Sequence, residues 1–149
     1  MHEYYYNQDN TKQALIMVDK VINILKKNND LKNLATYYIK KSEDLSSTNI
    51  EEANLLISEA IKIAIELEDN ELLLFSYINK SAILTDQGKY TKSIKLLYDS
   101  EKIITKKNIL NKELKIELYT EIAYIETKLN NYEKSKKYNM KVIEIETEM

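Results

Sequence analysis

Few side chains in this sequence could make or break covalent bonds. The chain has no Cys, its single Gly is Gly88, and its single His, His2, lies at an end that is expected to fray. Thiol and Ser–His catalysis, Cys-ligated zinc and Gly-rich phosphate loops are therefore excluded, and no Glu-x-x-His pair supports a di-iron bundle. We expect a protein that is not an enzyme, with no catalytic residue, metal site or cofactor.

The other chemically notable groups are paired charges and tyrosines. Glu51 with Glu52, and Glu144 with Glu148, have the spacing of a solvated helix face rather than of an acid/base pair. The Lys pairs at 106–107 and 136–137 could contact anions, but solvated helix ends or faces are the more common role of such pairs. Most of the twelve Tyr fall at helical spacing, which favours core positions over aromatic recognition.

Composition narrows the fold class and the partners. With one Gly and no Pro in 149 residues, the chain lacks the turn residues that sandwich and barrel folds require. The net charge is −2 and the chain has no Arg, so a concentrated basic face for nucleic acid is not expected. There is neither a secretory signal nor an apolar run that could span a membrane. We predict a soluble, cytoplasmic protein with no nucleic-acid or membrane partner.

The most informative pattern is an internal repeat. The pattern Tyr-Ile-x-Lys-Ser-x-x-Leu occupies residues 38–45 and recurs 39 residues later at 77–84. Each copy is followed by a second amphipathic segment in which apolar or small residues recur three or four apart, and a third copy begins near Tyr119, so three helix pairs are predicted. The second-helix positions are Ile50, Ala53, Ile57, Ala60 and Ile63; Tyr90, Ser93, Leu97, Ser100 and Ile103; and Tyr132, Ser135, Asn139, Val142 and Ile145.

The ends of the expected helices carry recognisable signals. Residues Thr48 to Glu51 match a capping box that would open a helix, with Thr48 as its first residue. Gly88 lies where the chain must reverse after a helix. Lys26 and Lys27 are placed favourably at the end of a helix dipole, before the polar segment 28–30. Further reversals are expected at 69–70 and 130–131.

This pattern resembles the tetratricopeptide repeat, a helix-turn-helix unit written W-x2-L-G-x2-Y, then A-x3-F, then P. The Trp position is Tyr in all three copies, and the small position of each helix is Ser or Ala. These residues are Tyr38, Tyr77 and Tyr119; Ser42, Ser81 and Ala123; and Ala53, Ser93 and Ser135. The resemblance implies an all-α fold of antiparallel helix pairs stacked as a right-handed superhelical solenoid.

The chain also departs from the family pattern. Lys41 and Lys80 stand where the motif has Leu, Glu126 replaces its Tyr, Asn139 replaces its Phe, and no copy has the closing Pro. The repeats exceed the usual length of about 34 residues, as in bacterial regulatory arrays of this family.

We expect a single domain, 1–149, that comprises a partial repeat, 1–29, and full repeats at 30–69, 70–110 and 111–149. In the partial repeat, 4–6 would end a first helix and Ala14 would be the small position of the second. The chain thus begins inside a repeat and ends without a polar cap, which indicates a fragment of a longer protein or an array whose ends are covered by a second copy.

In arrays of this family a concave groove is lined by first-helix residues that point away from the second helix. By the resemblance, this groove is mildly acidic, with Phe75, Ile78 and Tyr124 as apolar anchors. Its lining is Glu3, Tyr6, Asn7, Ile39, Lys40, Glu43, Phe75, Ile78, Asn79, Ala82, Asp86, Glu117, Thr120, Glu121, Tyr124 and Lys128.

The charges of the predicted groove residues disfavour an acidic ligand. Chaperone-binding members of the family clamp an acidic carboxyl terminus, and Asn79 fits that pattern. Ile39, Glu43, Glu117 and Glu121 take the other clamp positions, where carboxylates would repel an acidic tail. A neutral or basic peptide or protein segment with apolar anchors is expected instead.

Two functions remain open at this stage. The first is a non-catalytic scaffold that binds a protein or peptide in the groove. The alternative is a ligand-sensing segment of a larger bacterial signalling protein, either a peptide receptor or a sensor joined to a kinase, cyclase or DNA-binding domain. Self-association through exposed repeat ends is a further possibility.

Overall fold

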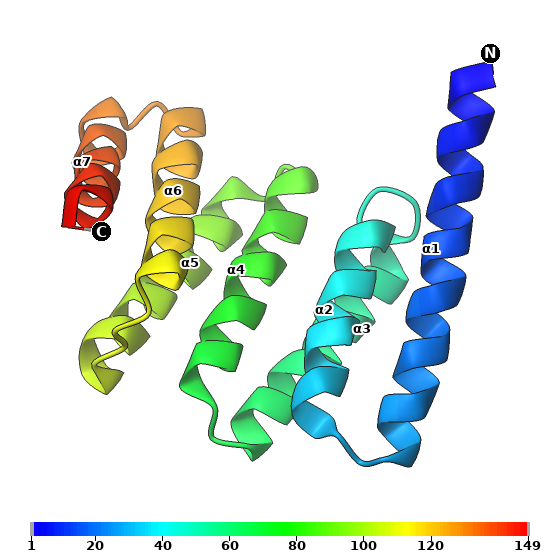
Figure 1. Ribbon diagram of the computed structural model, residues 1–149. Helices are drawn as coiled ribbons and strands as arrows, with labels where there is room; N and C mark the ends of the chain where they lie inside the picture. The colour runs from blue at the N-terminus through cyan, green and yellow to red at the C-terminus, as the bar shows by residue number, and fades with distance from the viewer. Residues whose placement is uncertain (1, 149) are drawn as a thin grey trace. The chain divides into compact units, whose positions relative to one another are not determined.

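The computed structural model describes residues 2–148, with side chains described from residue 10 onward. Within this range the protein is all-α, as predicted, and Figure 1 shows its helices in chain order. The seven helices are α1 (His2–Lys27), α2 (Leu31–Leu45), α3 (Ile50–Glu66), α4 (Asn70–Asp86), α5 (Tyr90–Lys107), α6 (Lys112–Lys128) and α7 (Tyr132–Glu148).

Polar caps and left-handed residues set the helix boundaries. The N-cap side chains of α2, α3, α4 and α6 each accept a hydrogen bond from the backbone N–H three residues on, which satisfies a donor that the helix leaves unpaired. A residue with positive φ follows five helices within two residues of their ends, and one of these is Gly88 with φ 73°. The predicted reversals near 29, 69, 88 and 130 are confirmed.

The N-cap of α3 lies one residue beyond its predicted position. Asn49, not Thr48, is the N-cap: its Oδ1 accepts from the Glu52 backbone N–H at 3.2 Å, and its Nδ2 donates to Glu52 Oε2 at 3.2 Å. The Thr48 backbone N–H instead donates to the Leu45 carbonyl at 3.1 Å. Thr48 therefore belongs to the turn that ends α2, and Asn caps a helix at least as well as Thr.

The amino-terminal helix differs from the expected partial repeat. The backbone is continuously helical from His2 to Lys27, so 4–6 do not end a separate first helix. Ala14 is exposed rather than packed as a small helix-crossing position, whereas Val18 and Ile22 are buried. The residues between 6 and 14 include Asn and Asp, which can form turns, but no Gly or Pro interrupts this segment and its backbone stays helical throughout.

The chain divides into two compact units. The first, 1–67, contains α1 to α3; within it α2 packs against both α1 and α3. The second, 68–149, contains α4 to α7; here α4 packs against α5 and α6, and α6 packs against α5 and α7. In each unit the chain forms helix hairpins joined by short connections, which are visible in Figure 1.

The small positions of the repeat are buried where paired helices cross. Ser93 on α5 donates through Oγ to the Ser81 carbonyl of α4 at 2.9 Å and lies 2.9 Å from Thr85 Oγ1. In the third repeat, Ser135 Oγ donates to the Ala123 carbonyl at 2.9 Å and lies 2.7 Å from Thr127 Oγ1. In both repeats of the second unit, these small residues therefore let the two helices approach closely.

Aliphatic side chains form the interior of each unit. The core of the second unit combines residues of all four of its helices with the connecting Ile109, and its most deeply buried members are Leu74, Leu97, Leu118, Ile122 and Ile125. Among residues 2–148, no helix combines the length and apolar character needed to cross a membrane.

Candidate functional site

The predicted groove residues of the second unit come from α4 and α6. These helices pack against each other, and Asp86 on α4 acts electrostatically on Glu121 of α6, so the two helices contribute to a common surface. We call this surface the α4–α6 face. Its accessible or partly accessible residues are Phe75, Ala82, Asp86, Glu117, Thr120, Glu121, Tyr124 and Lys128.

Three predicted groove residues are buried. Ile39 on α2 and Ile78 on α4 are 1% and 2% exposed, and Ile78 belongs to the core of the second unit. Asn79 is also buried, and its Nδ2 donates to the Phe75 carbonyl at 2.9 Å. In this structure these side chains offer no surface to a ligand, because they serve the helix packing.

The other predicted residues lie elsewhere. Lys40 and Glu43 are exposed on α2 of the first unit, and the Lys40 ammonium lies 5.8 Å from the centroid of the Tyr37 ring. The side chains of Glu3, Tyr6 and Asn7 are outside the described residues. The α4–α6 face is therefore the part of the predicted groove that the structure brings together within one unit.

Three carboxyl groups give the α4–α6 face its electrostatic character. Burial raises the pKa of Glu117, and the negative charge of Glu121 raises it further. Burial likewise raises the pKa of Glu121, with a second contribution from the charge of Asp86. The carboxylates thus disfavour one another's ionised form, and a cation held among them would relieve that repulsion.

An aromatic side chain accompanies these acids. Tyr124 lies one turn beyond Glu121 on α6, and it is 48% exposed. The Lys128 ammonium group lies 5.3 Å from its ring centroid, which is within the range of a cation–π contact. The α4–α6 face therefore combines negative charge with an accessible apolar ring.

We expect Glu121→Gln to stabilise the second unit slightly at neutral pH. The folded-state pKa of Glu121 lies above its ordinary value of 4.5, so ionisation of this carboxyl opposes folding, and its removal should gain about 0.5 kcal/mol after solvent screening. The gain should be full above the raised folded pKa and vanish below 4.5. Urea unfolding of wild type and variant at neutral and acidic pH measures it. Glu144→Gln, on an exposed position of α7, controls for net charge, and an equal gain there would contradict the prediction.

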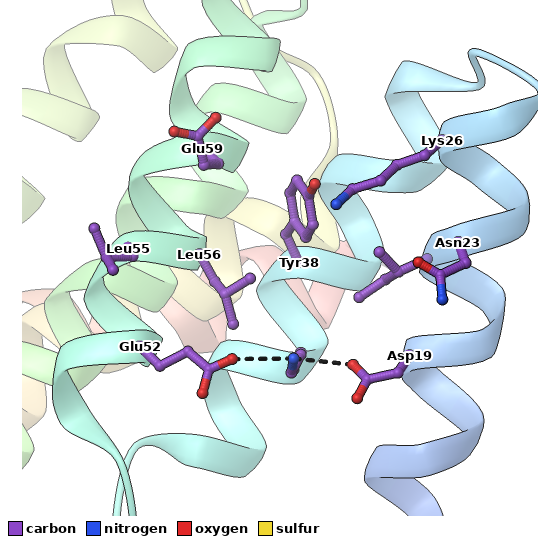
Figure 2. A pocket seen from close by; sticks show the side chains of 10 residues that line it. Asp19, Asn23, Lys26, Tyr38, Glu52, Leu55, Leu56 and Glu59 are labelled. Carbon is purple, nitrogen blue, oxygen red and sulfur yellow. Dashed lines mark ion pairs between the residues drawn. The ribbon is translucent and has the colours of Figure 1, made fainter.

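A second charged site lies in the first unit. The Lys41 ammonium on α2 pairs with Asp19 of α1 at 2.9 Å and with Glu52 of α3 at 3.1 Å, as the dashed lines in Figure 2 show. Burial lowers the pKa of Lys41, but the hydrogen bonds and charges of Asp19 and Glu52 more than compensate, so the net shift is upward. These groups line a hollow of about 450 Å³ in which the Tyr38 ring faces Lys26.

A third polar cluster stabilises the second unit. Glu126 of α6 is buried, with 2% exposure, although it is an acidic residue. The Tyr98 hydroxyl donates to Glu126 Oε1 at 2.5 Å, and Asn131 Nδ2 donates to Oε2 at 2.8 Å. Burial raises the pKa of Tyr98, and the hydrogen bond to the Glu126 carboxylate raises it further. This network joins α5, α6 and the turn before α7.

A neighbouring network is built on Glu101 of α5. The Tyr138 hydroxyl donates to Glu101 Oε1 at 2.8 Å, and the Lys141 ammonium donates to Oε2 at 3.3 Å. The same ammonium lies 4.7 Å from the Tyr138 ring centroid and 5.2 Å from that of Tyr119. Every group in this cluster is engaged, so its role is to dock α7 on α5 and α6.

Lys41 and Glu126 depart from the expected repeat motif, but the sequence alone predicted no role for them. The available signal was a charged residue at a position that the repeat places near the core, because such a residue must have a partner. Their partners could not be named, since Asp19, Tyr98 and Asn131 stand at positions that the motif does not constrain.

Fold and surface together define a class: an all-α protein of packed helix hairpins with charged, partly apolar surface sites. Among the described side chains, no group of three His, Asp or Glu residues gathers in a way that could hold a metal ion. Comparison of the chain with protein-family models, curated proteins and solved structures gives no match.

Proposed function

We propose that this protein is a non-catalytic scaffold that binds a protein or peptide ligand on the α4–α6 face. The observation that carries the proposal is the grouping of Asp86, Glu117 and Glu121 near the exposed Tyr124 ring. Stacking of the repeats as a right-handed tetratricopeptide-like solenoid, and a cytoplasmic location, belong to the same proposal. The stacking is supported by the repeat pattern and by the buried small residues at the helix crossings.

The ligand we propose is basic or neutral and carries an apolar side chain. Carboxylates that are partly desolvated and that repel one another gain most from a Lys or Arg side chain placed among them. Tyr124 offers an amphipathic ring, the kind of group that dominates binding energy at protein interfaces. An acidic ligand would meet like charges here, and it is disfavoured at this face.

The test uses Tyr124→Ala, because this exposed side chain can be removed without a large change in stability. With the complete chain as bait, we expect the affinity for a partner recovered from a lysate of the source cell to fall at least about tenfold, or 1.4 kcal/mol. Titration of the purified partner against wild type and variant measures the change.

Tyr132→Ala is the matched control, since Tyr132 is exposed on α7 and is not part of the α4–α6 face. This variant should bind as wild type does. Unchanged affinity of Tyr124→Ala, with helicity intact by circular dichroism, would place the ligand elsewhere. Phe75→Ala extends the test to α4.

A further inference from the structure

A hollow between α4 and α5 in the second unit has no role in the function proposed above. Its volume is about 400 Å³. Leu84 and Leu96 contribute its apolar lining, and Lys80, Lys92 and Lys95 supply positive charge. Its one acid, Asp99, pairs with Lys102 outside the hollow at 3.6 Å. The α4–α5 hollow is thus a site with an apolar lining and a basic rim.

The hollow is separate from the α4–α6 face. Lys80 and Leu84 each lie two residues before a member of that face, Ala82 and Asp86. Two residues correspond to about 200° of rotation around a helix axis. The two surfaces therefore lie on different sides of α4, one acidic and the other basic.

The first repeat shows what such a lysine does when an acid is available. Lys41 and Lys80 are equivalent residues in the repeated pattern, 39 positions apart. In the first unit, Lys41 holds the carboxylate of Glu52 from α3 at 3.1 Å (Figure 2). The residue of α5 that stands 40 positions after Glu52 is Lys92. The second repeat therefore has a positive charge where the first has the partner of its lysine.

A second difference between the two repeats also adds positive charge to the α4–α5 hollow. Leu55 of α3 lines the hollow of the first unit, and the residue 40 positions later on α5 is Lys95. The neighbouring position stays apolar, as Leu56 in the first repeat and Leu96 in the second. Within the part of the chain whose side chains are described, no carboxylate forms an ion pair with Lys80, Lys92 or Lys95. Three lysines thus line the hollow beside leucine side chains, and the acid that shares the hollow, Asp99, pairs with Lys102 instead.

We propose that the α4–α5 hollow binds an acidic segment of a partner protein. A carboxylate of that segment takes the place of Glu52 and pairs with Lys80, while Lys92 and Lys95 hold further acids. An apolar side chain of the segment packs on Leu84 and Leu96. A protein segment fits better than nucleic acid. Phosphate recognition favours an extended basic face with Arg side chains, and the chain has no Arg.

The test uses a defined probe and the complete chain. The probe is a short, fluorescein-labelled, Ala-based helical peptide with one central Leu and with Glu three and four residues to either side. We expect saturable binding by fluorescence anisotropy at low ionic strength, and weaker binding as salt is added. Peptides with Gln for every Glu, or with Ala for the Leu, should each bind more weakly than the parent.

The decisive variant is Lys92→Glu, which rebuilds the acid of the first repeat and gives Lys80 an internal partner. Lys92 is exposed, so the fold should tolerate the change. We expect affinity for the probe to fall at least about tenfold. The control is Lys134→Glu, the same charge change at the equivalent exposed position of the third repeat, and it should reduce affinity far less.

Three outcomes would overturn the proposal. The first is a probe that does not bind the wild-type chain at low salt. The second is equal loss of affinity in Lys92→Glu and Lys134→Glu, which would show a diffuse charge effect. The third is equal binding of the Glu and Gln peptides. Because Tyr124 is not part of the α4–α5 hollow, Tyr124→Ala should bind this probe as wild type does, so this test and that of the α4–α6 face fail independently.

Discussion

Replacement of Glu126 by Ala is expected to lower the unfolding free energy of the second unit by about 3 kcal/mol. The carboxylate is 2% exposed and accepts hydrogen bonds from Tyr98 at 2.5 Å and from Asn131 at 2.8 Å. Its removal leaves a phenol hydroxyl without its partner in a partly buried position and opens a cavity beneath α5. Hydrogen bonds to a charged group contribute more than those between neutral groups, so loss of the bonds from Tyr98 and from Asn131 is costly.

Urea unfolding followed by circular dichroism measures this effect. Because the chain comprises two compact units, we expect two unfolding transitions, with the loss in the transition assigned to 68–149. Tyr98→Phe removes one of the two hydrogen bonds and should cost less than Glu126→Ala. Glu126→Gln keeps the shape and one acceptor and should also cost less. A loss below about 1 kcal/mol for Glu126→Ala would show that the network contributes little to stability.

The helices and their ends were largely predictable, because they depend on residues close in sequence. An Asp or Asn before a helix caps it wherever the helix later packs, and Gly88 reaches positive φ without steric cost. Boundaries remained uncertain by one residue where two capping residues were adjacent, as with Thr48 and Asn49. The repeat spacing also located the small residues at the helix crossings, since only small side chains let two helices approach closely.

The candidate site was less predictable than the helices. Register placed Ile39, Ile78 and Asn79 on the groove side of their helices, but each of them is buried. Burial depends on the neighbouring helices, and a helical pattern read on one segment does not specify those neighbours. Ile78 is apolar, so assignment to the core was an equally valid interpretation of the same pattern.

Charged residues near the core were the hardest to interpret. Lys41 and Lys80 occupy equivalent positions, yet the first pairs with two acids and the second with none among the described residues. The difference has two causes. Asp19 of α1 pairs with Lys41, and the helix that follows each lysine carries an acid, Glu52, in the first repeat but Lys92 at the equivalent position of the second. Such a difference is visible in sequence only after the structure shows which residues face the lysine.

Replacement of Ser93 by Leu is expected to lower the unfolding free energy of the second unit by about 3 kcal/mol, an overpacking penalty at the upper end of the usual range. Ser93 is fully buried where α5 crosses α4, and its Oγ donates to the Ser81 carbonyl at 2.9 Å. A Leu side chain would have to enter the space between two backbones that approach closely at this point.

Ser93→Ala separates the two contributions to that loss. It removes the hydrogen bonds to Ser81 and Thr85 without adding volume, and it should cost about 1 kcal/mol. The first repeat already has Ala53 at this position, so an Ala at a helix crossing is compatible with the fold. Urea unfolding of the two variants measures the cost of the lost hydrogen bonds and the additional cost of overpacking. If Ser93→Leu proved no more costly than Ser93→Ala, the crossing would have room for a larger side chain, and a close approach of the two helices would not explain why the repeat keeps this position small.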